Sequence, residues 1–433
     1  MSDPTRALPT PAEARRVWWQ IGLTGFGGPA GQIALLHRLV VEERGWLDER
    51  AFLRGLNFCM LLPGPEAQQL ATWIGWRLHG VRGALVAGTA FVLPGAALIL
   101  ALAAGYAAYG RVPLVAAAFL GIKAAVLALV LEAVLRIGRR ALKSTLAGAI
   151  ALAAFLAIAA FAVPFPLVVL GAGLIGAVGA ARLDARGAAS EAPAATTAGP
   201  SAVRVLAIGL TLWFAPLLAL GLMLGADHRL VEVGGFLSAL AVVTFGGAYT
   251  VLAWVAQAAV TTFGWLSAGE MLDGLGLAET TPGPLILVLE FVGYLAAWRA
   301  PAPFEPWLAG TLGALLAVWV TFVPCFIWVL LGAAHVERLA AQPRLGGALA
   351  GITAAAVGVI AALGAWTAAG TLFAERAGLE WGAVSVELPR FASFDARAGA
   401  LTALAFALTF VARWGPLRML GACALGGMLL TRV

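Results

Sequence analysis

Apolar runs long enough to cross a lipid bilayer occupy most of this chain. A spanning α-helix needs about 20 mainly apolar residues, and thirteen segments approach or exceed that requirement, the last two being short. Only 12% of the 433 residues are charged, whereas soluble domains carry roughly a quarter. The pattern predicts an all-α polytopic membrane protein with about 13 transmembrane segments. The predicted segments are 17–39, 51–77, 82–109, 112–136, 143–162, 164–182, 203–224, 231–260, 268–298, 306–333, 346–371, 399–413 and 415–431.

The basic residues indicate how the chain is oriented rather than a nucleic-acid partner. The formal net charge is +6, but the Lys and Arg residues are scattered over short connections between apolar runs. With the N-terminus in the cytoplasm, most of them fall in cytoplasmic loops, as the positive-inside rule requires. The connection 38–54 is an exception, because it is dense in both signs and would lie outside. We expect a multi-pass protein of the cell inner (plasma) membrane, with no cleaved signal peptide.

Three short motifs recur at one constant offset, which predicts an internal duplication. The shift that takes Phe26 to Phe245 also relates the other two pairs, and small insertions follow further along the chain. We expect an N-terminal transport repeat at 1–182, a small, polar cytoplasmic linker at 183–201, and a C-terminal repeat with one extra leading helix at 202–433. The recurring pairs are Phe26-Gly27-Gly28 with Phe245-Gly246-Gly247, Gly45-Trp46-Leu47 with Gly264-Trp265-Leu266, and Pro63-Gly64-Pro65 with Pro282-Gly283-Pro284.

The two repeats are expected to be inverted. Their Phe-Gly-Gly segments lie seven predicted spans apart, and an odd number reverses the direction through the bilayer. Inverted repeats with Gly/Pro-interrupted helices at matching positions are typical of the central binding site of secondary transporters. Each Pro-Gly-Pro must break its helix, because proline removes a backbone donor and clashes with the preceding turn. The helix that restarts after the break presents free N–H groups and a partial positive charge, which suits an anion. The alternative is a packing kink without a ligand.

At these motifs the chain resembles the chromate ion transporter family in its long two-domain form. The resemblance runs from about residue 15 to 430. It implies a secondary transporter that exports chromate across the inner membrane and confers chromate resistance, with sulfate as a competing analogue. Two positions depart from the family pattern: Gln32, where we expect His, and Glu290, where we expect a neutral amide. The matching segments are FGGPAGQ (26–32), RGWLDERAFLRGL (44–56), LLPGPEAQQLATWIGWRLHG (61–80), FVLPG (91–95), TFGGAY (244–249), GWL (264–266) and ETTPGPLILVLEFVGYLAA (279–297).

Candidate site residues cluster at the breaks, with one basic residue elsewhere. Lys123 lies near the middle of the predicted span 112–136, where a cation is costly and faces either a substrate pathway or an interhelical partner. Within that span, Glu132 is expected to pair with Arg136. The residues expected to bind the substrate are Phe26, Gly27, Gly28, Pro63, Gly64, Pro65, Gln68, Lys123, Thr244, Gly246, Gly247, Thr281, Pro282, Gly283 and Pro284.

Two carboxyl groups follow the breaks and are candidates for proton coupling. A carboxylate repels an oxyanion, so neither Glu66 nor Glu290 is expected to ligate the substrate directly. A buried carboxyl can carry a proton, and the alternative for Glu66 is capping of the new helix.

Other functions remain open from the sequence. A sulfate, molybdate or other oxyanion permease on the same scaffold is the nearest alternative. A membrane-embedded reductase or other enzyme would need a cofactor motif, a nucleophile–base pair or a metal cluster, and the sequence has none of these signatures. We expect no cofactor and no metal. The expected partners are the oxyanion, protons, the lipid bilayer and, in a homodimer, a second copy of the chain, with no nucleic acid.

Overall fold

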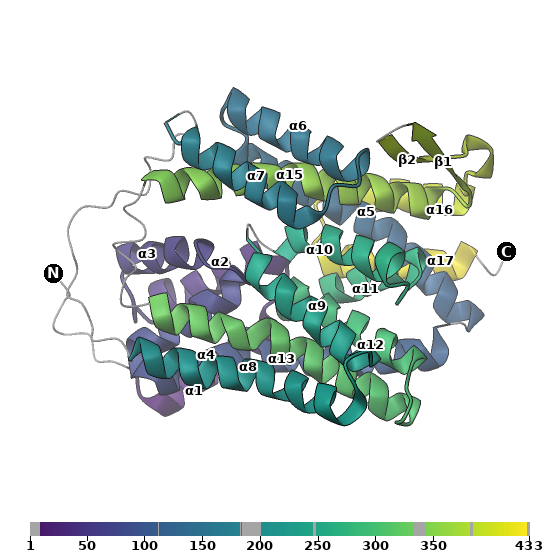
Figure 1. Ribbon diagram of the computed structural model, residues 1–433. Helices are drawn as coiled ribbons and strands as arrows, with labels where there is room; N and C mark the ends of the chain where they lie inside the picture. Colours follow the sequence, from purple (N-terminus) through teal and green to yellow (C-terminus); the bar gives the residue numbers. More distant parts are fainter. Residues whose placement is uncertain are drawn as a thin grey trace. The chain divides into compact units, whose positions relative to one another are not determined.

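The structure is a computed structural model that describes residues 9–110, 112–181, 183, 201–245, 248–332, 343–381 and 384–430. Within these ranges the chain is almost entirely helical, apart from one β-hairpin (Figure 1). It forms two compact units. Unit 1 comprises residues 1–101, 187–248 and 281–342, and unit 2 comprises residues 102–186, 249–280 and 343–433. Each unit takes segments from both halves of the chain, so the units cut across the division expected at 183–201, which stays a prediction about the repeats.

Unit 1 is built from the helices that surround the recurring motifs. α4 continues from unit 1 into unit 2. The elements are α1 (Pro11–Thr24), α2 (Gly28–His37), the π-helix η1 (Arg38–Glu43), α3 (Glu49–Met60), α4 (Glu66–Tyr109), α8 (Ala202–Leu224), α9 (Arg229–Val243), the short 3₁₀ helix η4 (Leu285–Leu287), α12 (Val288–Arg299) and α13 (Pro306–Gly332).

Unit 2 contains the remaining helices and the hairpin. Its elements are α5 (Pro113–Ala141), α6 (Thr145–Ala159), α7 (Phe165–Val178), α10 (Ala248–Gln257), η3 (Ala258–Thr262), α11 (Ala268–Thr280), α15 (Pro343–Leu372), β1 (Arg376–Trp381), β2 (Val384–Pro389), η5 (Phe391–Ser393), α16 (Ala396–Phe406), η6 (Ala407–Val411) and α17 (Pro416–Leu430). The antiparallel strands pair Arg376 with Pro389 and Trp381 with Val384.

The duplication extends from the motifs to the secondary structure. When α1, α2 and α3 are moved along the chain by the shift that takes Phe26 to Phe245, they coincide almost end to end with α9, α10 and α11. The π-helix η1 likewise coincides with η3. The same local sequence choices therefore produce the same series of elements twice.

The predicted continuous spans 17–39 and 231–260 are wrong, because each is broken at its Phe-Gly-Gly motif. α1 ends at Thr24 and α2 begins at Gly28, while α9 ends at Val243 and α10 begins at Ala248. In the first motif, Gly27 and Gly28 have φ values of +87° and +65°, a region that L-residues with a side chain rarely adopt. Both breaks close with the same tight turn, in which the Phe26 N–H donates to Thr24 O at 2.9 Å and the Phe245 N–H to Val243 O at 3.0 Å.

After each Pro-Gly-Pro the chain forms a helical hairpin. α4 is one such hairpin, since His79 and Gly80 have non-helical backbone angles and separate its two arms. The arms meet where a Cβ on Gly75 would overlap the Gly83 carbonyl oxygen. α12 and α13 form the corresponding hairpin, in which Gly293 and Gly313 approach each other in the same way. Small residues at such crossings let helix backbones pack closely.

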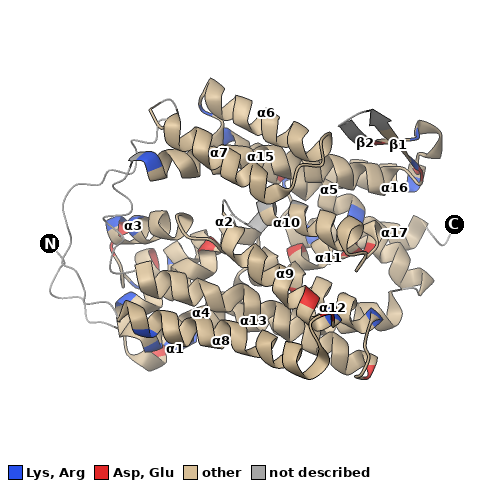
Figure 2. Ribbon diagram, in the orientation of Figure 1, with Lys and Arg blue, Asp and Glu red and all other residues tan. Residues whose placement is uncertain are grey.

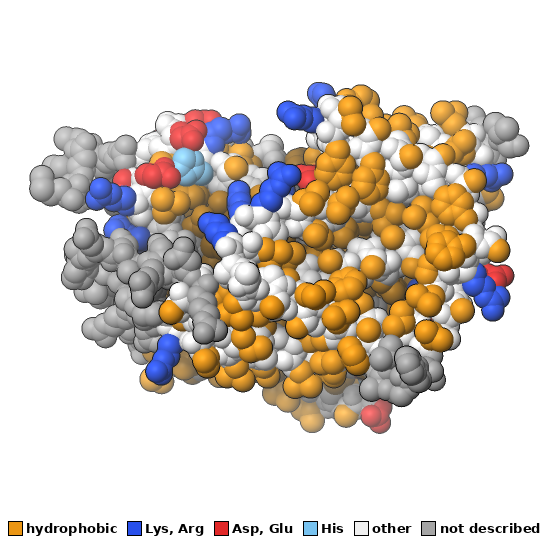
Figure 3. All heavy atoms as spheres, turned by 90° about the horizontal axis from the view of Figure 1, so that it is seen from above, with side chains coloured by type: hydrophobic (Ala, Val, Ile, Leu, Met, Phe, Trp, Pro, Cys, Tyr) orange, Lys and Arg blue, Asp and Glu red, His pale blue; other side chains and the backbone are white. Residues whose placement is uncertain are grey.

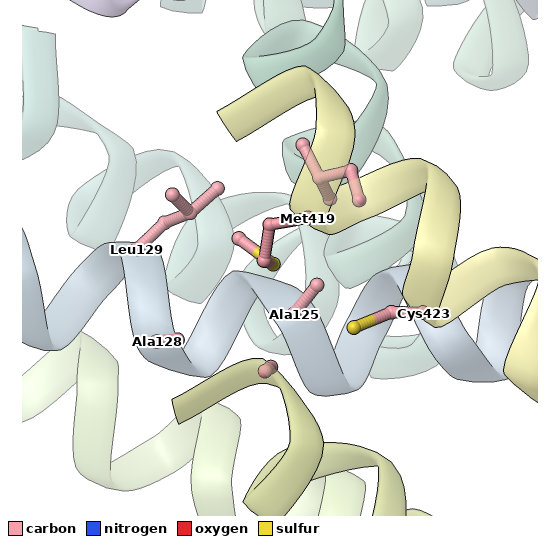
Figure 4. Packing of buried hydrophobic residues seen from close by; sticks show 7 residues of the cluster. Ala125, Ala128, Leu129, Met419 and Cys423 are labelled. Carbon is pink, nitrogen blue, oxygen red and sulfur yellow. The ribbon is translucent and has the colours of Figure 1, made fainter. Parts of the chain in front are cut away.

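Unit 2 repeats one packing scheme in its long helices. α5 packs against α16 and α17, and α15 packs against α6 and α7. Figure 4 shows part of the first interface, where Ala125, Ala128 and Leu129 of α5 meet Met419 and Cys423 of α17.

The surface is that of a protein solvated by lipid. Five helices are long and apolar enough to cross a membrane by length and composition: α4, α5, α8, α13 and most of α15. This supports a polytopic membrane protein, while the count of 13 spans stays a prediction. Side chains such as Val178 and Leu222 are 92% and 88% exposed, which suits an apolar solvent. Exposed hydrophobic side chains cover much of the face in Figure 3, and charged residues are sparse along the helices in Figure 2.

Candidate functional site

The two Pro-Gly-Pro breaks have the same backbone geometry. Gly64 and Gly283 have φ values of +126° and +101°, so both positions favour glycine. After the first break α4 begins at Glu66, and after the second η4 begins at Leu285. Each restarted helix has N–H groups without an intrahelical acceptor in its first turn. The breaks predicted from the sequence are therefore confirmed as real interruptions.

Each break is hydrogen-bonded to the Phe-Gly-Gly segment of the other repeat. The Gly64 N–H donates to Thr244 O at 2.7 Å, and the Gly283 N–H donates to Gly25 O at 3.1 Å. The acceptors stand directly before Phe245 and Phe26, so they too correspond under the repeat. The two bonds are thus equivalent, and donor and acceptor are exchanged between the halves. All four bonded residues belong to unit 1.

A second exchange involves the long arms of the hairpins. A Cβ on Gly64 would lie 2.8 Å from the Cys325 Sγ atom of α13, and one on Gly283 would lie 3.2 Å from the Gly95 Cα atom of α4. Gly95 and Cys325 follow Pro94 and Pro324, which are corresponding prolines of the two repeats. Each break is thereby enclosed by the long helix of the opposite repeat, and no side chain fits at either glycine without a shift.

Neutral polar side chains around the first break are buried and partly committed to internal bonds. Gln69 Nε2 donates to Pro63 O at 2.7 Å, and Gln68 Nε2 donates to the Thr72 hydroxyl at 3.0 Å. The side-chain oxygens of both glutamines are buried without a hydrogen-bond partner. Thr244 donates its hydroxyl proton to Leu240 O at 2.6 Å, in the last turn of α9. Its carbonyl oxygen accepts the hydrogen bond from the Gly64 N–H.

Gln32 holds the second break, a role that the sequence did not reveal. Its Nε2 atom lies 3.2 Å from Gly25 O and 2.5 Å from Gly283 O, and the side chain is 1% exposed. Gln32 thus joins the same two residues as the Gly283–Gly25 bond. The corresponding residue of the second repeat is Val251, which has no donor to offer. The sequence shows that Gln32 is a polar side chain in an apolar stretch, but it does not show which groups Gln32 contacts.

The two candidate proton-coupling residues differ in their surroundings. Glu66 is the first residue of α4 and is partly exposed. A carboxylate there stabilises the first turn of the helix. Glu290 lies in α12 and is only 1% exposed, and its Oε2 atom has no hydrogen-bond partner. The Tyr294 hydroxyl, one turn further along, is also buried without one.

Lys123 is paired with another helix, as the alternative interpretation of this residue allowed. Its Nζ atom lies 3.3 Å from Oδ1 of Asp273 in α11, within unit 2. The Tyr106 hydroxyl donates to Oδ2 of the same carboxylate at 2.6 Å. Asp273 was missed by the sequence analysis, although an acid inside the predicted span 268–298 was a usable signal. The expected Glu132–Arg136 pair is confirmed at 4.0 Å.

The remaining substrate-binding candidates differ in burial and in whether the structure describes them. Gly246 and Gly247 lie outside the described residues. Thr281 is buried, and Phe26 is partly exposed. All the described substrate-binding candidates except Lys123 belong to unit 1. Among the described residues, no group of three or more His, Cys, Asp or Glu side chains could hold a metal ion.

Comparison with known proteins identifies the family. The model of the chromate transporter family matches residues 12–177 and 231–428, which is most of the chain. The chain belongs to the chromate transporter family. It is 34% identical to a chromate transport protein of Pseudomonas aeruginosa over 365 residues, covering 83% of this chain and 82% of the relative. It is 27% identical to a chromate transport protein of Cupriavidus metallidurans, covering 79% and 78%. No solved structure matches this chain.

Membership of the chromate transporter family confirms the class predicted from the sequence. The curated relatives with chromate in their names are transport proteins, not enzymes. Together with the apolar helices, this makes the chain a multi-pass membrane transport protein. The two matched regions exclude residues 178–230, which contain all of α8 and the segment 183–201 predicted to be a linker.

Gln32 offers a direct test of how this chromate transporter family member holds its second break. Gln32→Leu should lower the thermal unfolding midpoint of the purified protein by several degrees, because it leaves the carbonyls of Gly25 and Gly283 with less hydrogen bonding in an apolar interior. An unsatisfied buried polar group costs about 1–3 kcal/mol. Gln20→Leu, at an exposed position of α1, is the matched control and should leave the midpoint unchanged. Equal midpoints for both variants would contradict the assigned role.

Proposed function

We propose that this protein is a secondary transporter that exports chromate across the cell inner membrane and confers chromate resistance. The observation that carries the proposal is the exchanged pair of hydrogen bonds, Gly64 to Thr244 and Gly283 to Gly25. Through these bonds each repeat anchors the interrupted helix of the other. Secondary transporters have their substrate site at such an interface between repeats. Family membership and the chromate transport proteins among its relatives support chromate as the substrate.

The oxyanion is proposed to bind at the helix starts after Pro65 and Pro284. Each start carries roughly half a positive charge, and its free N–H groups point toward an incoming anion. Two starts offset about one of the two negative charges of chromate. Neutral donors such as Gln68 and Thr281 would replace part of its hydration shell.

A basic residue is needed for the remaining charge, and Lys123 is our candidate. In the present structure its ammonium is occupied by Asp273. Its participation therefore requires that this ion pair open during the transport cycle.

The transport cycle is proposed to use two inverted repeats within about 13 spans. The exchanged bonds and the matching element series support a pseudo-twofold relation, with the axis in the membrane plane. The repeats would rock around the fixed site to alternate access. An experimental structure in a lipid bilayer should place both breaks near the midplane and the two Phe-Gly-Gly segments in opposite directions. Parallel repeats would rule out this mechanism.

Proton coupling belongs to the same proposal, with Glu66 and Glu290 as the residues suggested by the sequence. The partners are then chromate, protons and the bilayer, and a homodimer stays a sequence-based expectation. A sulfate, molybdate or other oxyanion permease is the alternative within the same fold, because sulfate and molybdate share the tetrahedral shape and charge of chromate.

Substrate competition tests the anion site. Inverted membrane vesicles containing the protein should accumulate labelled chromate when energised. Excess sulfate should reduce the rate several-fold, whereas chloride at equal ionic strength should not, because only sulfate is a tetrahedral dianion. Inhibition by chloride with no effect of sulfate would show that the site does not recognise this shape and charge. Uptake of sulfate that chromate does not inhibit would favour the alternative permease.

Lys123 is tested by substitution in the same vesicles. Lys123→Ala should reduce chromate uptake to the background level in a protein that is still inserted, and Lys123→Arg should retain part of the rate because it keeps the charge. Lys143→Ala, at an exposed position after α5, is the control. Normal uptake by Lys123→Ala would assign Lys123 a structural role only.

A further inference from the structure

We propose that Asp273 is a proton-binding site, and that its protonation releases Lys123 so that proton and oxyanion bind together. The inference rests on the proposed transport of oxyanions and deepens it by naming the residue that carries the proton. The observation behind it is a three-residue cluster around the buried carboxyl of Asp273, contributed by the end of α4, by α5 and by α11.

The cluster surrounds one carboxyl group with two different partners. Asp273 is 4% exposed. The Tyr106 hydroxyl donates to its Oδ2 atom at 2.6 Å, and the Lys123 ammonium lies 3.3 Å from its Oδ1 atom. The second distance exceeds the roughly 2.7–2.9 Å of a tight charge-assisted hydrogen bond. The carboxyl is thus anchored firmly by Tyr106 and held more loosely by Lys123.

This arrangement suits a carboxyl that alternates between two charge states. When it is ionised, the neighbouring ammonium compensates its charge. When it is protonated, the Tyr106 hydrogen bond remains available, and the Lys123 side chain can turn outward because 23% of it is already exposed. Gly269, one turn before Asp273 on α11, places no side chain beside the ammonium.

Glu290 lacks these partners. It is 1% exposed, its Oε2 atom has no hydrogen-bond partner, and no ion pair to it is present among the described residues. A charge on Glu290 would be buried without compensation, which costs several kcal/mol. Asp273 can lose its proton at a smaller cost, and this is why we place the proton there.

Few other charges face the cluster from the helices that form it. On α11 itself, Glu270 lies one turn before Asp273 and accepts hydrogen bonds from Ser267, and Glu279 lies near the helix end. On α5, the next charged residue after Lys123 is Glu132, which is paired with Arg136.

The other elements packed against α11 add little charge. They are η3, α15 and α17. Their charged residues are Arg344 and Arg418, both in a first helical turn. Lys123 is therefore the charge that responds most directly to the state of Asp273.

The proton balance gives the sign of the coupling. A proton that adds to the Asp273 carboxylate cancels the negative partner of Lys123 and leaves an uncompensated cation, which strengthens oxyanion binding. Loss of the proton restores the ion pair and weakens binding. A dianion that moves with one proton carries a net single negative charge, so its export is driven by a membrane potential that is negative inside.

The test measures sulfate binding to the purified full-length protein as a function of pH. Sulfate is the probe because its own charge stays constant in the neutral range, unlike that of chromate. For one linked proton, the affinity should fall by up to about tenfold per pH unit above the titration of Asp273. Asp273→Asn should bind sulfate with an affinity that does not change with pH. Glu270→Gln removes an acid from the same helix and should behave like the wild type.

Each outcome decides the inference. A wild-type affinity independent of pH, or an Asp273→Asn affinity that keeps the wild-type pH dependence, overturns it while leaving oxyanion binding intact. If Asp273→Asn does not fold, Asp273→Ser removes the same carboxyl, keeps Lys123 and a small polar side chain, and should also bind sulfate independently of pH.

A readout without the anion separates this inference from the proposed function. If the wild type binds neither sulfate nor chromate, the proposed function fails. Infrared titration then decides the proton site, because the carbonyl stretch of a protonated carboxyl should appear on acidification and be missing from Asp273→Asn. An unchanged band in that variant, or no band in the wild type, overturns the assignment.

Discussion

The structure of unit 1 depends on how two backbone N–H groups are satisfied in an apolar interior. Gly64 and Gly283 stand where proline residues have interrupted a helix, and an unpaired N–H in lipid costs several kcal/mol. Each finds its acceptor in the opposite repeat, at Thr244 and Gly25. The positive φ values that aim these N–H groups favour glycine, and the close approach of Gly95 and Cys325 leaves no room for a side chain. The broken helices, the exchanged repeats and the candidate anion site all follow from this one requirement.

The local features of the site were readable from the sequence. Pro-Gly-Pro predicts a helix break because proline removes a backbone donor and the backbone freedom of glycine disfavours a helix. The constant offset between the motifs predicts that the break occurs twice. The exchange between repeats was not readable, since the motif gives the position of a donor but not that of its acceptor. The interruption at Phe26 was also missed, because an apolar run looks continuous unless the backbone angles of Gly27 and Gly28 are known.

Polar contacts between residues far apart in the chain were the second feature that could not be predicted from the sequence. Lys123 could be recognised as costly in a membrane span, but its partner Asp273 lies far along the chain, in the other half of the sequence. The role of Gln32 could not be predicted either, because its side chain contacts the backbone carbonyls of Gly25 and Gly283. Every residue has a backbone carbonyl, so the residue types at these positions do not indicate the contact. Sequence patterns therefore predicted which residues are unusual, and the fold determined which of them meet.

The exchanged hydrogen bonds also bear on how the chain matures during synthesis. The ribosome releases Gly64 long before Thr244, so the donor exists well before its acceptor has been made. Throughout that interval the first break has no partner from the second half, so it must stay hydrated or be shielded by the insertion machinery. The first half alone therefore cannot complete its native hydrogen bonds in the bilayer, and the native arrangement forms only after the second half has been synthesised.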